Sequence, residues 1–516
     1  MKTKIILGPP GTGKTEYLLR RIEEELADGT DPTRIGYFAY TVKAANEART
    51  RAMSRFQHLD KKDFMYFRTL HSLAFRQLGV TKNDVMKDEH FRELSNLLGI
   101  KLSNTNRKMD TFGFQMQDDV FAKVIDMARV RNITLKQQFQ EIGHLEGGWM
   151  KLKYIADGIK EYKKTRNLYD FTDMIIQFNK SNNDEIIPEF DVFIIDEAQD
   201  LLPIQWTMVK KIMNKAARVY VAGDDDQSIF KWAGANPQDL IGLNGERFIL
   251  DKSHRVPLEV HKIATKLINK VKNRIPKVWA PKTSESRGSV LTHVTRNSVY
   301  QQIEKDKGQW LIMARDNYTL EQIAEEMRVR GFYYSMYGIP SVSTKRLTAI
   351  MAWTDLSKNK KAISVDRIRT MYHYMTVKKG VAYGHKGLST ADPEKLYTFE
   401  ELSLYHGLMV PSHRIWHHAL DRMPAHEVTY IVSLLRRKEK LNQEPRINLS
   451  TIHGAKGGEA DNVMLVTDLP RKADESYFQN PDDERRVFYV GMTRAKKALH
   501  LVRSETDREF HEAFHG

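Results

Sequence analysis

Residues 5–15 read IILGPPGTGKT, and this stretch decides the fold of the surrounding chain. A glycine-rich turn between an apolar strand and a helix aims backbone N–H groups at a phosphate, with the helix dipole behind them. The lysine of such a loop reaches the β- and γ-phosphates, and the hydroxyl after it binds Mg²⁺. A chance match in a chain of this length has a probability on the order of a few per cent. The candidate nucleotide-binding residues are Gly8, Pro9, Pro10, Gly11, Thr12, Gly13, Lys14, Thr15 and Glu16.

Residues 190–200, reading FDVFIIDEAQD, place acids directly after a second apolar strand. Parallel sheets bind ligands at the carboxyl ends of their strands. With the phosphate loop on the neighbouring strand, Asp196 is expected to complete the Mg²⁺ site with Thr15, and Glu197 to orient or deprotonate the attacking water. Taken alone, an acidic cluster in this place is more often the N-cap of a helix.

Strand-like and helix-like segments alternate along much of the chain, which predicts an α/β fold with parallel sheets and helical crossovers. A helix is expected from Ala44 to about Arg55. Strands are expected at 34–40, 190–195 and 217–222 in one core, and at 310–314, 447–451, 462–466 and 498–502 in a second, with the last strand closing its sheet. Two stretches rich in helix formers interrupt the alternation. The expected division is 1–79 and 167–247 for the first core around an insertion at 80–166, and 248–354 and 445–516 for the second core around an insertion at 355–444.

Composition limits the possible functions. Hydrophobic residues make up 41% of the 516 residues and charged residues 28%, as in soluble globular proteins, and no apolar run is long enough to span a bilayer. The absence of cysteine excludes disulfides, Cys-zinc sites and a thiol nucleophile. The net charge of +15 favours a polyanionic partner such as nucleic acid, although a solvated basic surface is the alternative.

Residues 223–235, reading GDDDQSIFKWAGA, follow another predicted strand with three acids, a glutamine and two aromatic residues. Such an ending is costly for folding and indicates that these side chains have a function. Further segments follow in order: YFRTLHS at 66–72, YDFTDMI at 169–175, SHR at 253–255, TIHGAKGGE at 451–459 and ERRVFYVGMTRA at 484–495. In their kind and order these segments resemble the UvrD/Rep family of superfamily 1 DNA helicases. The resemblance implies two RecA-like P-loop NTPase cores, each carrying a mainly helical insertion.

The same resemblance implies roles for the residues around the nucleotide. Gln227 would sense the γ-phosphate, while Arg255 and Arg494 would enter the site from the second core and stabilise charge on the transferring phosphoryl group. Catalysis then requires the cleft between the cores to close. Glu459 would accept a hydrogen bond from the ribose, and His254 stands where the family usually has a tyrosine stacked on the base. The implied catalytic set is Lys14, Glu197, Gln227, Arg255 and Arg494.

A track for single-stranded DNA is also implied by the resemblance. Aromatic faces hold bases without sequence preference. The alternative is that these aromatic residues are core, but Trp232, between Lys231 and Ala233 beyond a strand end, fits a groove better. Ala233 replaces an arginine that is common in the family. The implied DNA-binding residues are Tyr40, Thr41, Thr69, His71, Phe230, Trp232, Asn317 and His453.

We therefore expect a DNA-dependent ATPase, specifically an ATP-dependent DNA helicase and single-stranded DNA translocase with 3′ to 5′ polarity. One alternative is a translocase that displaces bound proteins but unwinds poorly without a partner, because the second insertion lacks a recognisable duplex-binding hairpin. Another is a non-catalytic nucleic-acid scaffold, against which the intact catalytic set argues.

The expected cofactors are ATP and Mg²⁺, and the expected partners are single-stranded DNA and tailed duplex DNA, with replication or repair accessory proteins and no membrane. We expect a monomer or weak oligomer in the cytoplasm, either associated with the nucleoid or as a viral protein in a host cell. The sequence begins one strand before the phosphate loop. The upstream segment whose glutamine reads adenine in the family is therefore missing from it, and we expect lower selectivity for ATP.

Overall fold

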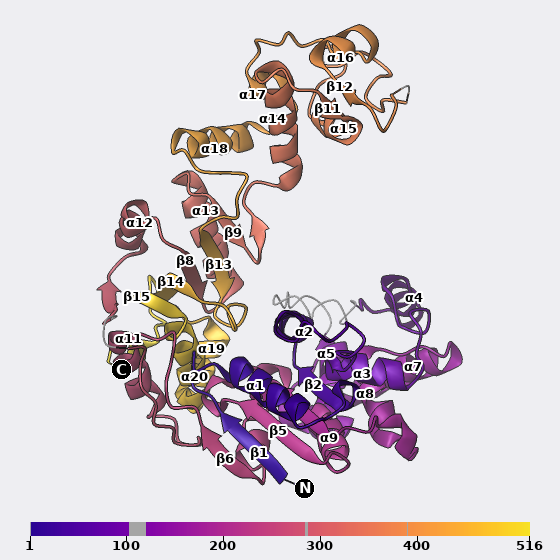
Figure 1. Cartoon of the computed structure of the whole chain (residues 1–516), viewed down its shortest axis with the longest axis vertical. Coiled ribbons are helices and arrows are strands. Elements are labelled where there is room, and N and C mark those ends of the chain that lie inside the picture. Colours follow the sequence, from indigo (N-terminus) through magenta and orange to yellow (C-terminus); the bar gives the residue numbers. More distant parts are fainter. Residues whose placement is uncertain (1, 103–119, 284–286, 390, 516) are drawn as a thin grey trace. The chain divides into compact units, whose positions relative to one another are not determined.

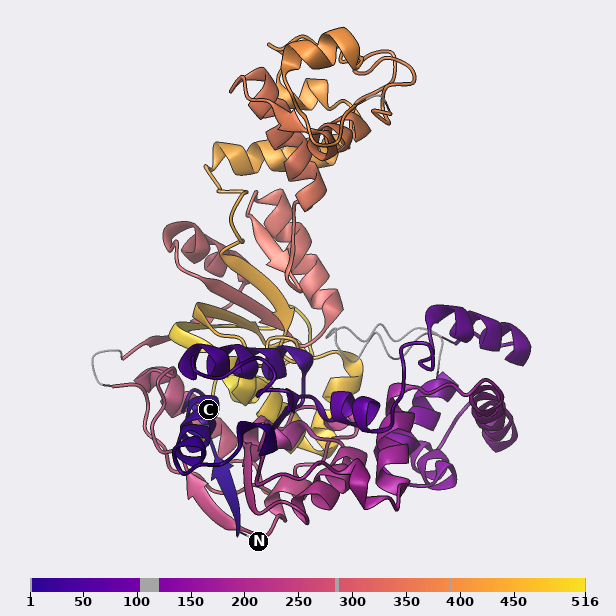
Figure 2. The ribbon, with the colours of Figure 1, turned by 45° about the vertical axis from the view of Figure 1, so that its right-hand side comes forward.

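The computed structural model describes residues 2–102, 120–283, 287–389 and 391–515. The chain divides into two compact units, one made of Met1–Val299 with Ile452–Gly516 and the other of Tyr300–Thr451. Figures 1 and 2 show the elements of both, and each unit is described by itself. Within the described residues, no helix combines the length and the apolar composition that a membrane span requires.

The first unit contains a six-stranded parallel sheet with the strand order β3-β2-β4-β5-β1-β6. Its strands are β1 (Lys2–Leu7), β2 (Ile35–Ala39), β3 (Phe67–Arg68), β4 (Val192–Asp196), β5 (Arg218–Gly223) and β6 (Glu246–Ile249). The expectation that the strand before Asp196 neighbours the phosphate-loop strand is wrong, because β5 lies between β4 and β1. Helix α9 (Pro203–Met213) leads the chain from β4 into β5, which takes the place beside β1. Strand β6 pairs with β1, so this sheet extends across the predicted junction at 247–248.

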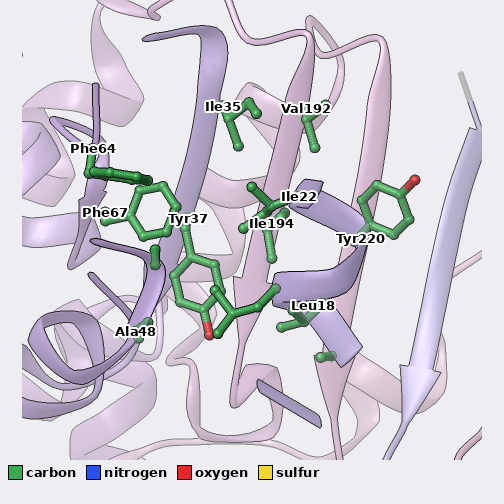
Figure 3. Packing of buried hydrophobic residues seen from close by; sticks show 14 of the residues in the cluster. Leu18, Ile22, Ile35, Tyr37, Ala48, Phe64, Phe67, Val192, Ile194 and Tyr220 are labelled. Carbon is green, nitrogen blue, oxygen red and sulfur yellow. The ribbon is translucent and has the colours of Figure 1, made fainter. Parts of the chain in front are cut away.

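Helices α1 (Lys14–Ala27) and α2 (Val42–Arg55) pack on one face of this sheet. The apolar residues of α1 recur at helical spacing, so that Leu18 and Ile22 lie over Val192 and Ile194 of β4 (Figure 3). Burying each such side chain contributes about 1.5–3 kcal/mol. This packing fixes the start of α1, and with it the phosphate loop, against the carboxyl edge of the sheet.

The first insertion is helical in its described part, and residues 103–119 of the predicted 80–166 lie outside the described residues. Its helices are α4 (Asp88–Leu98), α5 (Val120–Val130), α6 (Leu135–Ile142) and α7 (Gly148–Thr165). Helices α3 (Leu70–Gln77) and α8 (Phe171–Lys180) flank it in sequence and contact each other.

Three further parallel strands of the first unit run in the order β14-β15-β7. They are β7 (Ser289–His293), β14 (Ala460–Val466) and β15 (Ala495–Val502). The expectation that the strand at 498–502 closes its sheet is wrong, because β7 pairs along its outer side. The remaining helices of the unit are α10 (Gln238–Ile241), α11 (Leu258–Ile268), α19 (Arg471–Gln479) and α20 (Pro481–Met492).

The second unit has strands in the order β10-β9-β13-β8, of which β9, β13 and β8 are parallel. These are β8 (Trp310–Ala314), β9 (Tyr334–Met336), β10 (Ile339–Pro340) and β13 (Ile447–Thr451). Helix α12 (Arg296–Lys305) spans the division between the units, and α13 (Asn317–Val329) follows β8.

The second insertion, orange in Figures 1 and 2, is helical apart from one short strand pair among its described residues. Its elements are α14 (Thr344–Ser357), β11 (Ile363–Ser364), α15 (Val365–His373), β12 (Leu396–Tyr397), α16 (Phe399–Tyr405), α17 (Trp416–Ala419) and α18 (Ala425–Arg436). Helix α14 crosses the predicted boundary at 354–355 without a break.

Candidate functional site

The phosphate loop connects β1 to α1 through glycines that no other residue can replace easily. Gly11 and Gly13 have φ angles of 74° and 80°, in the left-handed region. A Cβ atom at Gly8 would lie 2.0 Å from Cγ of Lys14, and one at Gly11 would lie 2.4 Å from Cβ of Arg255. A side chain at Gly8 or Gly11 would therefore collide with Lys14 or Arg255.

Thr15 and Asp196 are in contact, as the Mg²⁺ prediction requires. They are so even though β1, which leads to Thr15, and β4, which ends at Asp196, are not neighbouring strands. The Thr15 hydroxyl donates to Asp196 Oδ2 over 3.0 Å. The hydroxyl of Tyr37, on β2, donates to the same oxygen over 2.6 Å. Burial, followed by the charge of Glu197, raises the pKa of Asp196. The apolar run of β2 could have indicated that Tyr37 is buried, but nothing in the sequence pointed to Asp196 as its partner.

Glu197 is held beside Lys14 by a strained backbone. Its φ of 54° is left-handed, which is uncommon for a residue with a side chain and typical of functional sites. Its Oε1 lies 3.6 Å from Nζ of Lys14, and Gln199 donates a hydrogen bond to its other oxygen. Burial opposes ionisation, but the charges of Lys14 and Lys456 outweigh it and lower the pKa of Glu197 to about 2. The side chain is therefore a carboxylate at neutral pH.

Gln227 joins the end of β5 to Arg494. Its Nε2 donates to Asp224 Oδ2 over 2.7 Å, and its Oε1 accepts from Nη2 of Arg494 over 2.9 Å. The Arg494 guanidinium also donates to the carbonyl of Val490 over 2.9 Å. Burial, and then the neighbouring charge of Arg255, lower the pKa of Arg494 to about 9.

The segment 253–255 lies directly against the phosphate loop. Ser253 donates to the carbonyl of Pro10 over 2.8 Å, and the amide of His254 donates to the carbonyl of Gly11 over 2.8 Å. The guanidinium of Arg255 pairs with Glu459 over 2.5 Å. The compact unit that contains the phosphate loop thus also contains both arginines that were expected to arrive from another core.

Glu16 is exposed at the first turn of α1 and pairs with Arg55 over 2.7 Å. The hydrogen bond from Arg55 lowers the pKa of Glu16, and partial burial opposes this shift without cancelling it. Glu16 therefore lies beside the loop, but in this structure its carboxylate is directed to α2 rather than to the loop.

These residues fit a Mg²⁺-nucleotide. Two arginines and one lysine converge near the loop, and the buried Arg494 guanidinium lies close enough to Arg255 for the charge to disfavour it, which an anion would relieve. One hydroxyl and one carboxylate suit Mg²⁺, which takes few protein ligands and fills its other positions with water and phosphate oxygens. Among the residues described, no group of three or more His, Cys, Asp or Glu able to hold a metal occurs.

Four of the predicted DNA-binding residues form one aromatic cluster, made of Tyr40, Phe230, Trp232 and His453. Tyr40 stacks on Phe230 with ring centroids 5.9 Å apart, and the rings of Trp232 and His453 lie 6.0 Å apart at a steep angle. Phe230 is only 3% exposed, whereas Trp232 is 41% exposed. Phe230 therefore takes the position that the core alternative expected, while Trp232 offers a face to a base.

The other predicted DNA-binding residues do not join this cluster. Thr41 and Thr69 cap the N-termini of α2 and α3 by accepting from the amides of Ala44 and Ser72. Burial lowers the pKa of His71 to about 4, so this side chain is uncharged at neutral pH.

Asn317 belongs to the second unit, where its side-chain oxygen accepts from the hydroxyl of Tyr337. It begins α13, directly beyond the carboxyl end of β8.

Sequence reasoning missed several residues that connect the site. Gln199 accepts from the amide of Asp224 over 2.9 Å while it donates to Glu197, and so bridges the ends of β4 and β5. Lys456 donates to Asp200 over 2.5 Å and to the carbonyl of Gln227 over 2.6 Å. Both residues lie in motif segments, 190–200 and 451–459, but nothing in the sequence indicated which residues they contact.

Comparison with known proteins agrees with this geometry. The model of the UvrD/REP helicase N-terminal domain matches residues 1–246, and that of the UvrD-like helicase C-terminal domain matches residues 418–506. A probable DNA helicase II homolog of Rickettsia felis is 22% identical over 98% of this chain and 91% of its own length. The ATP-dependent DNA helicases PcrA of Leuconostoc citreum and Rep of Buchnera aphidicola are 23% and 21% identical, each over 96% of this chain and over 79% and 88% of their own lengths. With its parallel α/β sheets and its phosphate loop, the chain belongs to the UvrD/Rep-like family of superfamily 1 helicases.

Proposed function

We propose that this chain is an ATP-dependent DNA helicase that moves along single-stranded DNA in the 3′ to 5′ direction. The contact that supports this most directly is made by Lys456, whose ammonium group donates to the carbonyl of Gln227 and lies 5.2 Å from the ring centroid of Phe230. Gln227 belongs to the nucleotide residues and Phe230 to the aromatic cluster. A change at the γ-phosphate can therefore reach the aromatic cluster through one side chain.

The hydrolysis step is assigned to residues of the first unit. Lys14 leaves Glu197 for the β- and γ-phosphates, while Arg494 and Arg255 stabilise the charge that develops on the transferring phosphoryl group. Mg²⁺ bound by Thr15 and Asp196 would neutralise phosphate charge. Glu197, whose carboxylate lies beside Lys14 and accepts from Gln199, is assigned to orient or deprotonate the attacking water.

Translocation is assigned to the aromatic cluster with Asn317. Trp232 stacks on a base, and the change at Gln227 on hydrolysis alters the packing of Phe230 against Tyr40. The net charge of +15 supports binding to the DNA backbone. The proposal includes action in the cytoplasm as a monomer or weak oligomer, with replication or repair accessory proteins.

Strand separation on two matched substrates tests this proposal. A duplex with a 3′ single-stranded tail should be unwound in the presence of ATP and Mg²⁺, a duplex with a 5′ tail should not, and single-stranded DNA should stimulate hydrolysis. Glu197→Gln is the inactive control. Stimulated hydrolysis without strand separation on either substrate would instead favour the translocase that displaces bound proteins. Turnover equal in the native protein and in Glu197→Gln would contradict both.

A further inference from the structure

Three consecutive aspartates at the end of β5 share one lysine. The side chains of Asp224, Asp225 and Asp226 are at most 1% exposed, as is that of Lys277. Nζ of Lys277 lies 3.1 Å from Asp224, 2.6 Å from Asp225 and 3.0 Å from Asp226. Arg274 forms a two-pronged ion pair with Asp226, over 2.8 and 2.6 Å. Buried carboxylates stay ionised only when they are paired, so Lys277 is the central countercharge of this group.

The loop that carries Lys277 is itself fixed. The amide of Ile275 donates to Asp225 Oδ2 over 2.9 Å. Arg486 of α20 donates to the carbonyls of Asp225 and Asn273, over 3.1 and 2.6 Å. Lys277 therefore stands in one place relative to the aspartates.

The two neighbours of Gln227 dictate the orientation of its carboxamide. An ionised Asp224 can only accept hydrogen bonds, and Arg494 can only donate them. The NH₂ of Gln227 must therefore face Asp224 and its oxygen must face Arg494, and the structure places Nε2 2.7 Å from Asp224 and Oε1 2.9 Å from Arg494. A reversed amide would lose both bonds and would leave buried polar groups unpaired.

This orientation depends on the charge of Asp224, and hence on Lys277. Without the ammonium group, Asp224 and Asp225 would have no direct ion-pair partner among the described residues, because Arg274 pairs with Asp226. A buried carboxylate without a countercharge favours its protonated form. A protonated Asp224 can donate to the oxygen of Gln227, which would turn the amide over and direct its NH₂ at Arg494.

We propose that Lys277 is a positioning residue for ATP hydrolysis, which acts through Asp224 to hold Gln227 in the orientation that binds Arg494. The inference rests on the proposed role of Gln227 in hydrolysis. Lys277 lies outside every segment that carried the family resemblance.

A kinetic double-mutant cycle on the full chain tests this with Lys277→Met and Gln227→Ala. Lys277→Met should lower kcat of DNA-stimulated hydrolysis about 10- to 100-fold, the effect of losing a hydrogen bond to a charged group, and should leave KM for ATP within about threefold. Lys277→Arg, which keeps the charge, should recover part of kcat. In the Gln227→Ala background, Lys277→Met should change kcat by less than about twofold.

The matched control is Lys163→Met. Lys163 is also a buried lysine and lies 2.8 and 2.6 Å from two aspartates, Asp170 and Asp173, but its ion pairs connect only helix α7 to the start of α8. This variant should lose stability but keep kcat per folded molecule. Thermal unfolding measured alongside separates the two effects.

The proposal for Lys277 alone would be overturned if the fold-losses of kcat in the two single variants multiplied in the double variant. An equal loss of kcat in Lys163→Met would overturn it as well. If Gln227→Ala leaves hydrolysis unchanged, or if the native protein does not hydrolyse ATP, the function proposed above fails as well. If Lys277→Met does not fold, Lys277→Gln, which removes the charge but keeps a hydrogen-bond donor, replaces it in the same cycle.

Discussion

Two buried ionic clusters in the first unit look alike but have different neighbours. In the nucleotide cluster, Lys277 and Arg274 form ion pairs with Asp224–Asp226, and Asp224 contacts Gln227. In the insertion cluster, Lys163 and Arg129 neutralise Asp170 and Asp173, and the ion pairs join α5 and α7 to α8. Buried paired charges are therefore not in themselves a sign of chemistry. The role of such a cluster depends on the residue that it contacts outside the cluster, which for the nucleotide cluster is Gln227.

The largest expected effect distinguishes Arg494, which binds Gln227 beside the nucleotide cluster, from Arg129, a member of the insertion cluster. Arg494→Ala should lose about 10³-fold or more in kcat, because the charge on the transferring phosphoryl group loses its partner, while nucleotide and DNA binding remain. Arg129→Ala should keep its turnover per folded molecule. Steady-state hydrolysis with titrations of a fluorescent nucleotide and of labelled DNA measures the three quantities. Similar losses of kcat in both variants would remove the distinction between the clusters.

Next in size is the effect on stability of the insertion cluster. Arg129→Ala leaves Asp170 and Asp173 with Lys163 alone, and breaking a largely buried ion pair costs about 3 kcal/mol of unfolding free energy. Urea unfolding followed by tryptophan fluorescence measures this loss. Arg34→Ala, at an exposed ion pair, should cost much less and serves as the control.

A smaller effect tests how far the influence of the nucleotide cluster extends towards DNA. Trp232→Ala should weaken binding of single-stranded DNA by about 1–2 kcal/mol through lost stacking, and should reduce DNA stimulation while basal hydrolysis persists. Phe478, which is 80% exposed in the same unit, provides the control Phe478→Ala. Loss of basal turnover in Trp232→Ala would mean that the nucleotide residues and the aromatic cluster are not separable.

The smallest expected effect concerns Tyr489, a buried tyrosine beside the nucleotide cluster. The hydroxyl of Tyr489, fully buried near Asp224 and Asp226, has no hydrogen-bond partner among the described residues. Tyr489→Phe should therefore change the unfolding free energy by no more than about 0.5 kcal/mol and leave kcat as it is. Tyr37→Phe removes a bonded hydroxyl and should cost about 1–2 kcal/mol, with urea unfolding measuring both variants. Equal costs would show that the Tyr489 hydroxyl has a partner.

Local features of the fold were predictable from the sequence, because they depend on short-range chemistry. The strands at 310–314 and 447–451 match β8 and β13 residue for residue, and the glycines of the phosphate loop need their φ angles for the turn they make. The order of the strands was not predictable in the same way. Nothing local to Asp196 or Lys14 determines that β5 enters between their strands.

The residues of the candidate site also divide into those that local patterns predicted and those that they did not. The motif segments identified Thr15, Asp196, Gln227 and Arg494, which the structure brings into contact in two pairs. They could not identify Lys277, because a lysine 50 residues beyond Gln227 carries no local signal of the carboxylates it will meet. Ion pairs between residues far apart in the sequence are decided by how the elements pack, and local sequence patterns do not predict them.

The left-handed backbone of Glu197 has a consequence for evolution and engineering. A residue with a side chain is held there at a cost of about 1–3 kcal/mol, which glycine would largely avoid. A library of variants screened only for survival on heating would thus tend to enrich glycine at this position and discard the carboxylate. The most heat-stable variants in such a library would lack the carboxylate that hydrolysis needs. A search for a more stable form of this protein therefore has to select for turnover at the same time.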